Sequence, residues 1–249
     1  MNFRARATAY HLLGSATVAL LAAWLVFYYW YPPPLSQLAG GATLFMLVVV
    51  VDLVLGPALT AVVANPNKTY GHLIRDIGVI LAIQIAALAY GLHTVFVARP
   101  VAIAFEVGMF RLVSATEIEA EQLDQAPPEL RHLSWRGPVT LAAIKPSNEK
   151  EQFDTIQLGL AGIHLAALPR YWRNYDDHAG QAWELAIPIA KVLNRQPNLW
   201  QEIDKIASRA HVDPASLRIL PLLARKAEGM VLLAPGGRVA GMLAATAPP

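Results

Sequence analysis

Three long apolar stretches within residues 1–98 constrain the fold of this chain more than any other feature. They cover about 10–30, 38–64 and 77–97, and the first and third contain no Asp, Glu, Lys or Arg. A helix needs about 20 apolar residues to cross the roughly 30 Å hydrocarbon core of a bilayer. Each stretch is therefore predicted to form a transmembrane helix, which makes residues 1–98 a membrane domain with the lipid bilayer as a partner.

Charged residues gather after the third stretch. Of the 20 Lys and Arg, 16 fall within residues 99–249, and so do 16 of the 18 Asp and Glu. This segment therefore has the composition of an ordinary soluble domain and no formal net charge. The neutral balance argues against a nucleic-acid partner, because binding to phosphates needs an excess of basic residues.

Local patterns in residues 99–249 predict both strands and helices. Apolar and β-branched residues favour strands at 101–113 and 139–144. Periodicity and capping residues indicate helices at 146–168, 180–195 and 198–210, another beginning at Asp213-Pro214, and a closing hairpin around Gly236-Gly237. The predicted fold class is a membrane protein with three N-terminal transmembrane α-helices followed by a small α+β extracytoplasmic domain.

Basic residues near the apolar stretches predict the orientation. Arg4 and Arg6 precede the first stretch, Lys68 and Arg75 lie between the second and third, and loop 31–41 has no charge. The positive-inside rule then places the N-terminus in the cytoplasm and the C-terminal domain outside. A cleaved signal peptide is disfavoured, since bulky aromatics and prolines stand where a small-residue cleavage site belongs. For a Gram-negative source, we expect a multi-pass inner-membrane protein with a periplasmic domain.

A single acid interrupts the second apolar stretch. Asp52 lies near its centre, where a charge costs at least ~2.5 kcal/mol. Gly56-Pro57, one turn later, is expected to kink the helix and free a carbonyl group. In one interpretation, Asp52 is protonated, or it is satisfied internally by Gln84 or by a hydroxyl such as that of Thr60. In the other, Asp52, Gly56, Pro57 and Gln84 mark an intramembrane docking surface.

The loop "RYWRNYDDH" at 170–178 is the second candidate site. Its aromatic residues Tyr171, Trp172 and Tyr175 are of the types enriched at protein interfaces, although core packing explains them equally well. The run 176–178 offers two acids and a histidine, but adjacent residues do not converge on one metal ion. A solvated turn is the favoured interpretation of that run, and no metal site is predicted.

No catalytic motif stands out. The chain has no G-x-S-x-G, H-E-x-x-H, P-loop or G-x-G-x-x-G sequence. It also has no cysteine, which excludes disulfide and thiolate chemistry. We therefore expect neither an enzyme nor a cofactor.

Three segments carry a family resemblance. The sequence "VDLVLGPALTAVVANPNK" at 51–68, the run from Arg75 to Ile118, and "LLARKAEGMVLLAPGGRVAG" at 222–241 resemble the type IV pilin accessory proteins of the TfpX/TfpZ group. The chain departs from that family at Gly108-Met109-Phe110, where the family has Asp-Arg-Phe. The resemblance implies an inner-membrane accessory or chaperone protein that supports pilin stability and pilus assembly without enzymatic turnover. It implies the major pilin as partner and allows other pilus assembly proteins.

Two other functions compete with this expectation. A membrane-anchored sensor or signalling subunit with a periplasmic ligand-binding domain needs a cytoplasmic output module, and the predicted cytoplasmic segments are too short for one. A membrane enzyme built on Asp52, Gln84 and His93 needs its polar residues at one depth. A pilin-binding function fits the predicted topology, since three spans and a periplasmic domain can contact both the membrane helix and the head of a pilin. Two linked contacts raise the effective concentration of the second.

Overall fold

The computed structural model describes residues 3–64 and 69–244. Lys68, one of the residues behind the predicted orientation, lies outside these ranges. The chain forms two compact units, which are described separately. The membrane unit contains residues 1–32 and 40–98, and the outer unit contains Pro33–Ala39 together with residues 99–249.

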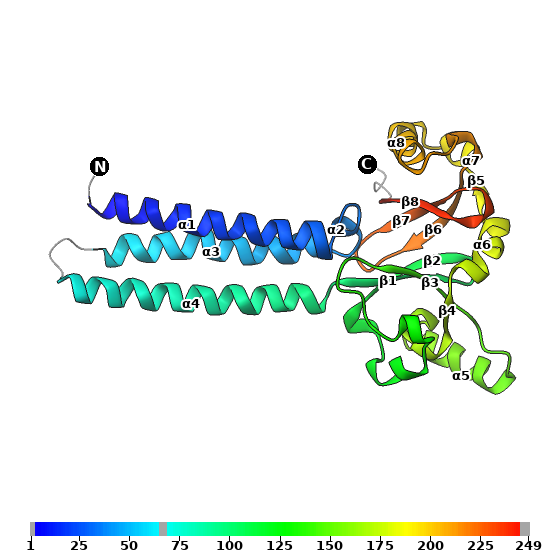
Figure 1. Cartoon of the computed structure of the whole chain (residues 1–249), viewed down its shortest axis with the longest axis horizontal. Helices are drawn as coiled ribbons and strands as arrows, with labels where there is room; N and C mark the ends of the chain where they lie inside the picture. The colour runs from blue at the N-terminus through cyan, green and yellow to red at the C-terminus, as the bar shows by residue number, and fades with distance from the viewer. Residues whose placement is uncertain (1–2, 65–68, 245–249) are drawn as a thin grey trace. The chain divides into compact units, whose positions relative to one another are not determined.

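Long helices make up the membrane unit (Figure 1). They are α1 (Phe3–Leu25), which continues into a π-helical turn at Val26–Trp30, α3 (Gly41–Val63) and α4 (Tyr70–Val97). All three are long and apolar enough to cross a membrane, which confirms the three predicted spans. The first helix begins seven residues before the predicted apolar stretch, because Arg4 and Arg6 extend it with residues that favour helix.

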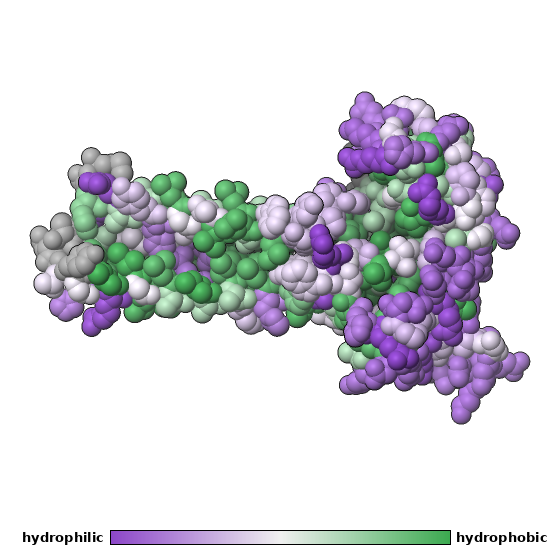
Figure 2. Space-filling model, viewed as in Figure 1, coloured by the Kyte–Doolittle hydropathy of each residue, from purple (hydrophilic) through white to green (hydrophobic). Residues whose placement is uncertain are grey.

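Helix α3 packs against both α1 and α4 (Figure 1). Large apolar side chains such as Leu47, Val62 and Ile83 remain exposed on the helices. Figure 2 shows that the visible surface of the membrane unit is largely hydrophobic. Such a surface is stable in lipid, where apolar side chains need no protein partner. The helices are therefore those of a membrane protein.

The outer unit is built on one mixed sheet. Its strand order is β4-β3-β1-β2-β6-β7-β8, with the short β5 paired to β6. Neighbours β1/β2, β3/β4, β6/β7 and β7/β8 are antiparallel, whereas β1/β3 and β2/β6 are parallel. The strands are β1 (Pro100–Glu106), β2 (Met109–Ser114), β3 (Val139–Ala143), β4 (Trp172–Asn174), β5 (Ile187–Pro188), β6 (Arg218–Leu223), β7 (Glu228–Leu233) and β8 (Val239–Ala244).

Short helices complete the outer unit and confirm its α+β class. They are α2 (Leu35–Leu38), α5 (Glu149–Leu160), α6 (Ala179–Leu185), α7 (Ile189–Leu193) and α8 (Trp200–Ala210). Helix α8 packs on β8, and α6 contacts β6. The predicted hairpin around Gly236-Gly237 is present as the antiparallel pair β7/β8.

Four local predictions need correction. The strand expected at 101–113 is a hairpin, because Val107 and Gly108 both adopt positive φ and reverse the chain. The helix expected at 146–168 ends at Leu160, just before Gly162, which also has positive φ. The helix expected at 180–195 is two short helices, α6 and α7, because Ile187–Pro188 between them form strand β5. At Asp213 the side chain accepts a hydrogen bond from Ala215 N, but only a 3-10 turn follows.

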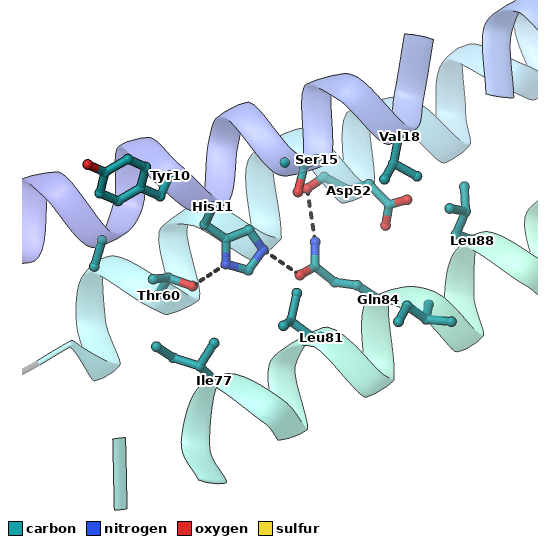
Figure 3. A pocket seen from close by; sticks show the side chains of 13 residues that line it. Tyr10, His11, Ser15, Val18, Asp52, Thr60, Ile77, Leu81, Gln84 and Leu88 are labelled. Atoms are coloured by element: carbon teal, nitrogen blue, oxygen red, sulfur yellow. Dashed lines mark hydrogen bonds between the residues drawn. The ribbon is translucent and has the colours of Figure 1, made fainter. Parts of the chain in front are cut away.

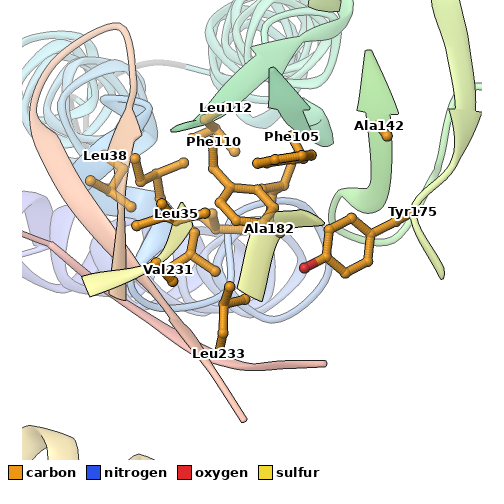
Figure 4. Close-up of a cluster of buried hydrophobic side chains, with 14 residues drawn as sticks. Leu35, Leu38, Phe105, Phe110, Leu112, Ala142, Tyr175, Ala182, Val231 and Leu233 are labelled. Carbon is orange, nitrogen blue, oxygen red and sulfur yellow. The ribbon is translucent and has the colours of Figure 1, made fainter. Parts of the chain in front are cut away.

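The segment between the first two membrane helices belongs to the outer unit. Leu35 and Leu38, one helical turn apart in α2, are buried in the same core as Phe105, Phe110 and Val231 (Figure 4). The main-chain oxygen of Leu38 accepts a hydrogen bond from Lys226 N at 3.1 Å. The outer unit therefore takes residues from within the expected 1–98 membrane domain, because two leucines of a loop complete its core.

Candidate functional site

A chain of hydrogen bonds links the three membrane helices (Figure 3). Thr60 Oγ1 of α3 lies 2.6 Å from His11 Nδ1 of α1, and His11 Nε2 lies 2.7 Å from Gln84 Oε1 of α4. Gln84 Nε2 then donates to the main-chain oxygen of Asp52 at 3.1 Å. Each of the three helices thus contributes a polar group to one cluster inside an apolar bundle.

The chemistry of the groups fixes the direction of the bond between His11 and Gln84. The oxygen of Gln84 can only accept, so His11 Nε2 carries a hydrogen and donates to it. The Thr60 hydroxyl, which can donate or accept, bonds to His11 Nδ1. The amide nitrogen of Gln84 donates to the main-chain oxygen of Asp52. Both ends of the Gln84 amide are therefore occupied.

Gly56 allows α4 to come this close to α3. A Cβ atom at position 56 would overlap Gln84 Nε2 and lie 2.6 Å from Gln84 Cδ. Pro57 follows within the buried face of α3, which remains helical from Gly41 to Val63. The structure brings Gly56 and Gln84 together beside Asp52, and Gly56 makes room for the Gln84 amide; the helix break expected at Gly56-Pro57 is not present.

The carboxylate of Asp52 takes no part in this hydrogen-bond network. Its residue is only 9% exposed, yet among the described residues it has no hydrogen-bond or ion-pair partner. The expected side-chain bond between Asp52 and Gln84 does not form, because Gln84 reaches the main-chain oxygen instead. Thr60, the other expected partner, bonds to His11. An unpartnered carboxylate therefore lies at the centre of α3.

An open groove runs along this cluster between α1 and α4. It has a volume of about 540 Å³, and Asp52 and Thr60 of α3 line it together with His11 and Gln84. Asp52 also borders a smaller hollow of about 280 Å³ between α3 and α4. The walls of the groove include Tyr10, Val18, Ile77, Leu81 and Leu88 (Figure 3). Ile85 also lines it.

Sequence reasoning missed the contribution of α1 to this site. His11 was available as a signal, since it is the one titratable group inside the first apolar stretch other than the tyrosines. Polar residues inside membrane helices usually face a bundle interior and mark a site. Applied to His11 as it was to Asp52, that principle predicts an inward-facing residue.

The aromatic loop is core and offers no contact surface. Tyr171, Trp172 and Tyr175 are all buried. Trp172 Nε1 donates to the main-chain oxygen of Ala166 at 2.9 Å, and the Tyr175 hydroxyl donates to that of Gly237 at 2.6 Å. Burial, with a smaller contribution from the Asp176 carboxylate, raises the pKa of Tyr175 to about 12. The core alternative holds for all three residues.

The run 176–178 forms a 3-10 turn. Across the described part of the chain, no three His, Asp or Glu side chains gather in a way that could hold a metal ion. The groove in the membrane unit, with its polar cluster, is therefore the candidate functional site.

Comparison with known proteins identifies the family. Residues 1–40 match the family model described as Fimbrial assembly protein FimB. The fimbrial assembly protein of serogroup I from Dichelobacter nodosus is 33% identical over 233 residues, which cover 93% of this chain and 91% of that relative. The chain belongs to the fimbrial assembly protein family. This membership confirms the resemblance to type IV pilin accessory proteins.

Two further fimbrial assembly proteins of Dichelobacter nodosus agree. The serogroup E1 protein is 32% identical over 233 residues, with the same coverage of both chains. The protein of serogroups C1 and C2 is 40% identical over 124 residues, which cover 50% of this chain and 95% of that relative. No solved structure matches the chain. The similarity to the longer relatives includes parts of both units of this fimbrial assembly protein.

Proposed function

We propose that this protein is a membrane accessory factor that binds the type IV pilin subunit and supports pilin stability and pilus assembly without enzymatic turnover. Its relatives are fimbrial assembly proteins, which supports a role in building the fibre. Its two units, one in the membrane and one outside it, suit a pilin that has a membrane helix and a globular head. Contact with both parts of one pilin raises the effective concentration of the second contact.

The unpartnered carboxylate of Asp52 is the observation that carries this proposal. Inside a bilayer, a carboxylate is expensive unless a partner, a proton or water satisfies it. Asp52 lies on an open groove and not in a closed core, so a membrane-embedded partner can reach it. A protein that binds another membrane protein needs a groove of this kind, open to the lipid and with an unsatisfied polar group on it.

We further propose an inner-membrane location with the N-terminus in the cytoplasm and the outer unit in the periplasm. Arg4 and Arg6 lie in the first turn of α1 and Arg75 near the start of α4, at the helix ends on the proposed cytoplasmic side. The shared core of Pro33–Ala39 and residues 99–249 supports three crossings, because one crossing before Pro33 and two more before Arg99 bring both segments to the same side.

Three experiments test the proposal. A periplasm-active reporter fused after Pro249 is expected to be active, and the same reporter fused at Asn67 silent; the reverse pattern contradicts the orientation. Crosslinking of the tagged full-length protein in native membranes is expected to capture pilin as the dominant partner. Loss of the protein should lower the pilin level. Absence of pilin from the crosslinked material, with an unchanged pilin level in the deletion strain, contradicts the function.

A further inference from the structure

The groove in the membrane unit has the features of a binding site for one more helix. Helix α3 contacts α1 and α4, and the 540 Å³ hollow lies between those two outer helices. The α1 residues on it, Ala7, Tyr10, His11, Gly14, Ser15 and Val18, recur at helical spacing and form one face. The groove is therefore bounded by regular helix faces on both sides.

Small residues on α1 leave space for close approach. A Cβ atom added to Gly14 would meet nothing within 4 Å. By contrast, the space beside Gly56 is occupied by Gln84 of α4, and the space beside Gly91 is occupied by Val48 of α3. Helices in membranes associate where small residues let their backbones come close. Gly14 offers such a position with no described helix on it.

The polar groups of the groove select the chemistry of the occupant. Thr60, His11 and Gln84 satisfy one another and hold the Gln84 amide on the main chain of α3, away from the Asp52 carboxylate. Asp52 is 9% exposed as a residue, and its carboxylate therefore remains as a free acceptor on the groove. A lipid tail would fill the groove but would leave this acceptor unsatisfied. A helix that carries a hydrogen-bond donor at the same depth would satisfy it.

We propose that the groove between α1 and α4 binds a single transmembrane helix that presents a hydrogen-bond donor to Asp52. This inference rests on the proposed function, under which the helix is that of the pilin. Asp52 sets the register of the bound helix, because only one depth brings the donor to the carboxylate. His11, Thr60 and Gln84 are positioning residues that keep the carboxylate available.

Two isoleucines of α4 provide a matched test. Ile85 lines the groove and is 66% exposed. Ile83 is 64% exposed, lies at nearly the same depth and points to the other side of the helix, away from the groove-lining residues Leu81, Ile85 and Leu88. Each is replaced in the full-length protein by the photo-crosslinking residue p-benzoylphenylalanine, and native membranes that contain pilin are irradiated.

The two positions are expected to differ. The Ile85 variant should crosslink to pilin, and the Ile83 variant should do so at least several-fold less. Equal yields, or an Ile85 product that is a second copy of this chain or lipid alone, overturn the groove assignment even where pilin still co-purifies. If pilin neither crosslinks nor co-purifies, the proposed function fails and the inference falls with it.

The role of Asp52 is tested in the same Ile85 background. Asp52→Leu removes the acceptor and should lower the pilin crosslink by about 3- to 30-fold, the range that one interhelical hydrogen bond supports. Asp52→Asn keeps a carbonyl acceptor and should lower it less. Yields are compared at equal amounts of the protein in the membrane. An unchanged yield in Asp52→Leu overturns the assignment of Asp52 as the acceptor.

Discussion

Replacing Gly56 with alanine tests how α3 and α4 meet. In an isolated helix, Gly→Ala is favourable by about 1 kcal/mol because glycine is a poor helix former. Here the added Cβ overlaps Gln84 Nε2 and lies 2.6 Å from Gln84 Cδ, so the amide must move. Two hydrogen bonds, to His11 and to the Asp52 main chain, depend on its present position.

The magnitude follows from these bonds. Interhelical hydrogen bonds in membranes contribute about 0.6 kcal/mol on average and up to about 1.7 kcal/mol. Losing two of them costs about 1–3 kcal/mol, which offsets the propensity gain and leaves Gly56→Ala destabilising by up to about 2 kcal/mol. In a Gln84→Ala background the obstacle is gone, and Gly56→Ala should become neutral or stabilising by up to about 1 kcal/mol.

A double-mutant cycle measures this coupling. The full-length protein and the variants Gly56→Ala, Gln84→Ala and the double variant are unfolded by SDS titration in mixed micelles and followed by far-UV circular dichroism. We expect a coupling energy of about 1–3 kcal/mol between positions 56 and 84. Additive effects, or a stabilising Gly56→Ala in the otherwise native protein, would refute the contact between the two residues.

Three further predictions concern the outer unit, each read from unfolding of the full-length protein in detergent by near-UV circular dichroism. Trp172→Ala should destabilise by about 3–5 kcal/mol through the lost burial, and Trp172→Phe by only about 1 kcal/mol through the lost hydrogen bond; equal effects would contradict the packing role. Val107→Asn should stabilise by about 1 kcal/mol and raise the midpoint by about 2–4 °C, because Asn tolerates positive φ before Gly108 in a two-residue turn; a lower midpoint would count against the turn geometry. The pKa of Tyr175 is raised from 10.0 to about 12 in the folded state, so its contribution to stability is complete below pH 10 and is lost as the pH rises through about 12. Tyr175→Phe should flatten that decline, and an unchanged pH profile would show that another group causes it.

The sequence predicted the membrane helices well because their signal is local. A run of about 20 apolar residues identifies a span regardless of its neighbours. The partners of Asp52 could not be predicted in this way. Each helix is apolar on all sides, so its periodicity does not indicate how it is rotated about its own axis. That rotation decides that Gln84 meets His11 and a main-chain oxygen instead of the carboxylate.

Residues of the outer unit show the same division between local and distant information. The β1/β2 hairpin went unpredicted because its turn is Val107-Gly108, without the Asn-Gly or Asp-Gly pair that marks such turns. The aromatic residues of loop 170–178 suit a core and an interface equally. Trp172 is buried because β4 pairs with β3, a contact across many residues that the sequence pattern did not contain.

The two leucines of α2 have a consequence for how this protein is made. Leu35 and Leu38 leave the ribosome long before β6 and β7, so the core that receives them is complete only when those late strands have been synthesised. A fragment cut at Arg99, the obvious soluble version of the outer unit, would lack both side chains and carry a hole in its core. Each missing leucine would cost that fragment about 2–5 kcal/mol, a large part of the stability of a small domain. The outer unit is therefore a composite whose pieces come from two distant parts of the gene, and a fusion that restores Pro33–Ala39 is the form to express.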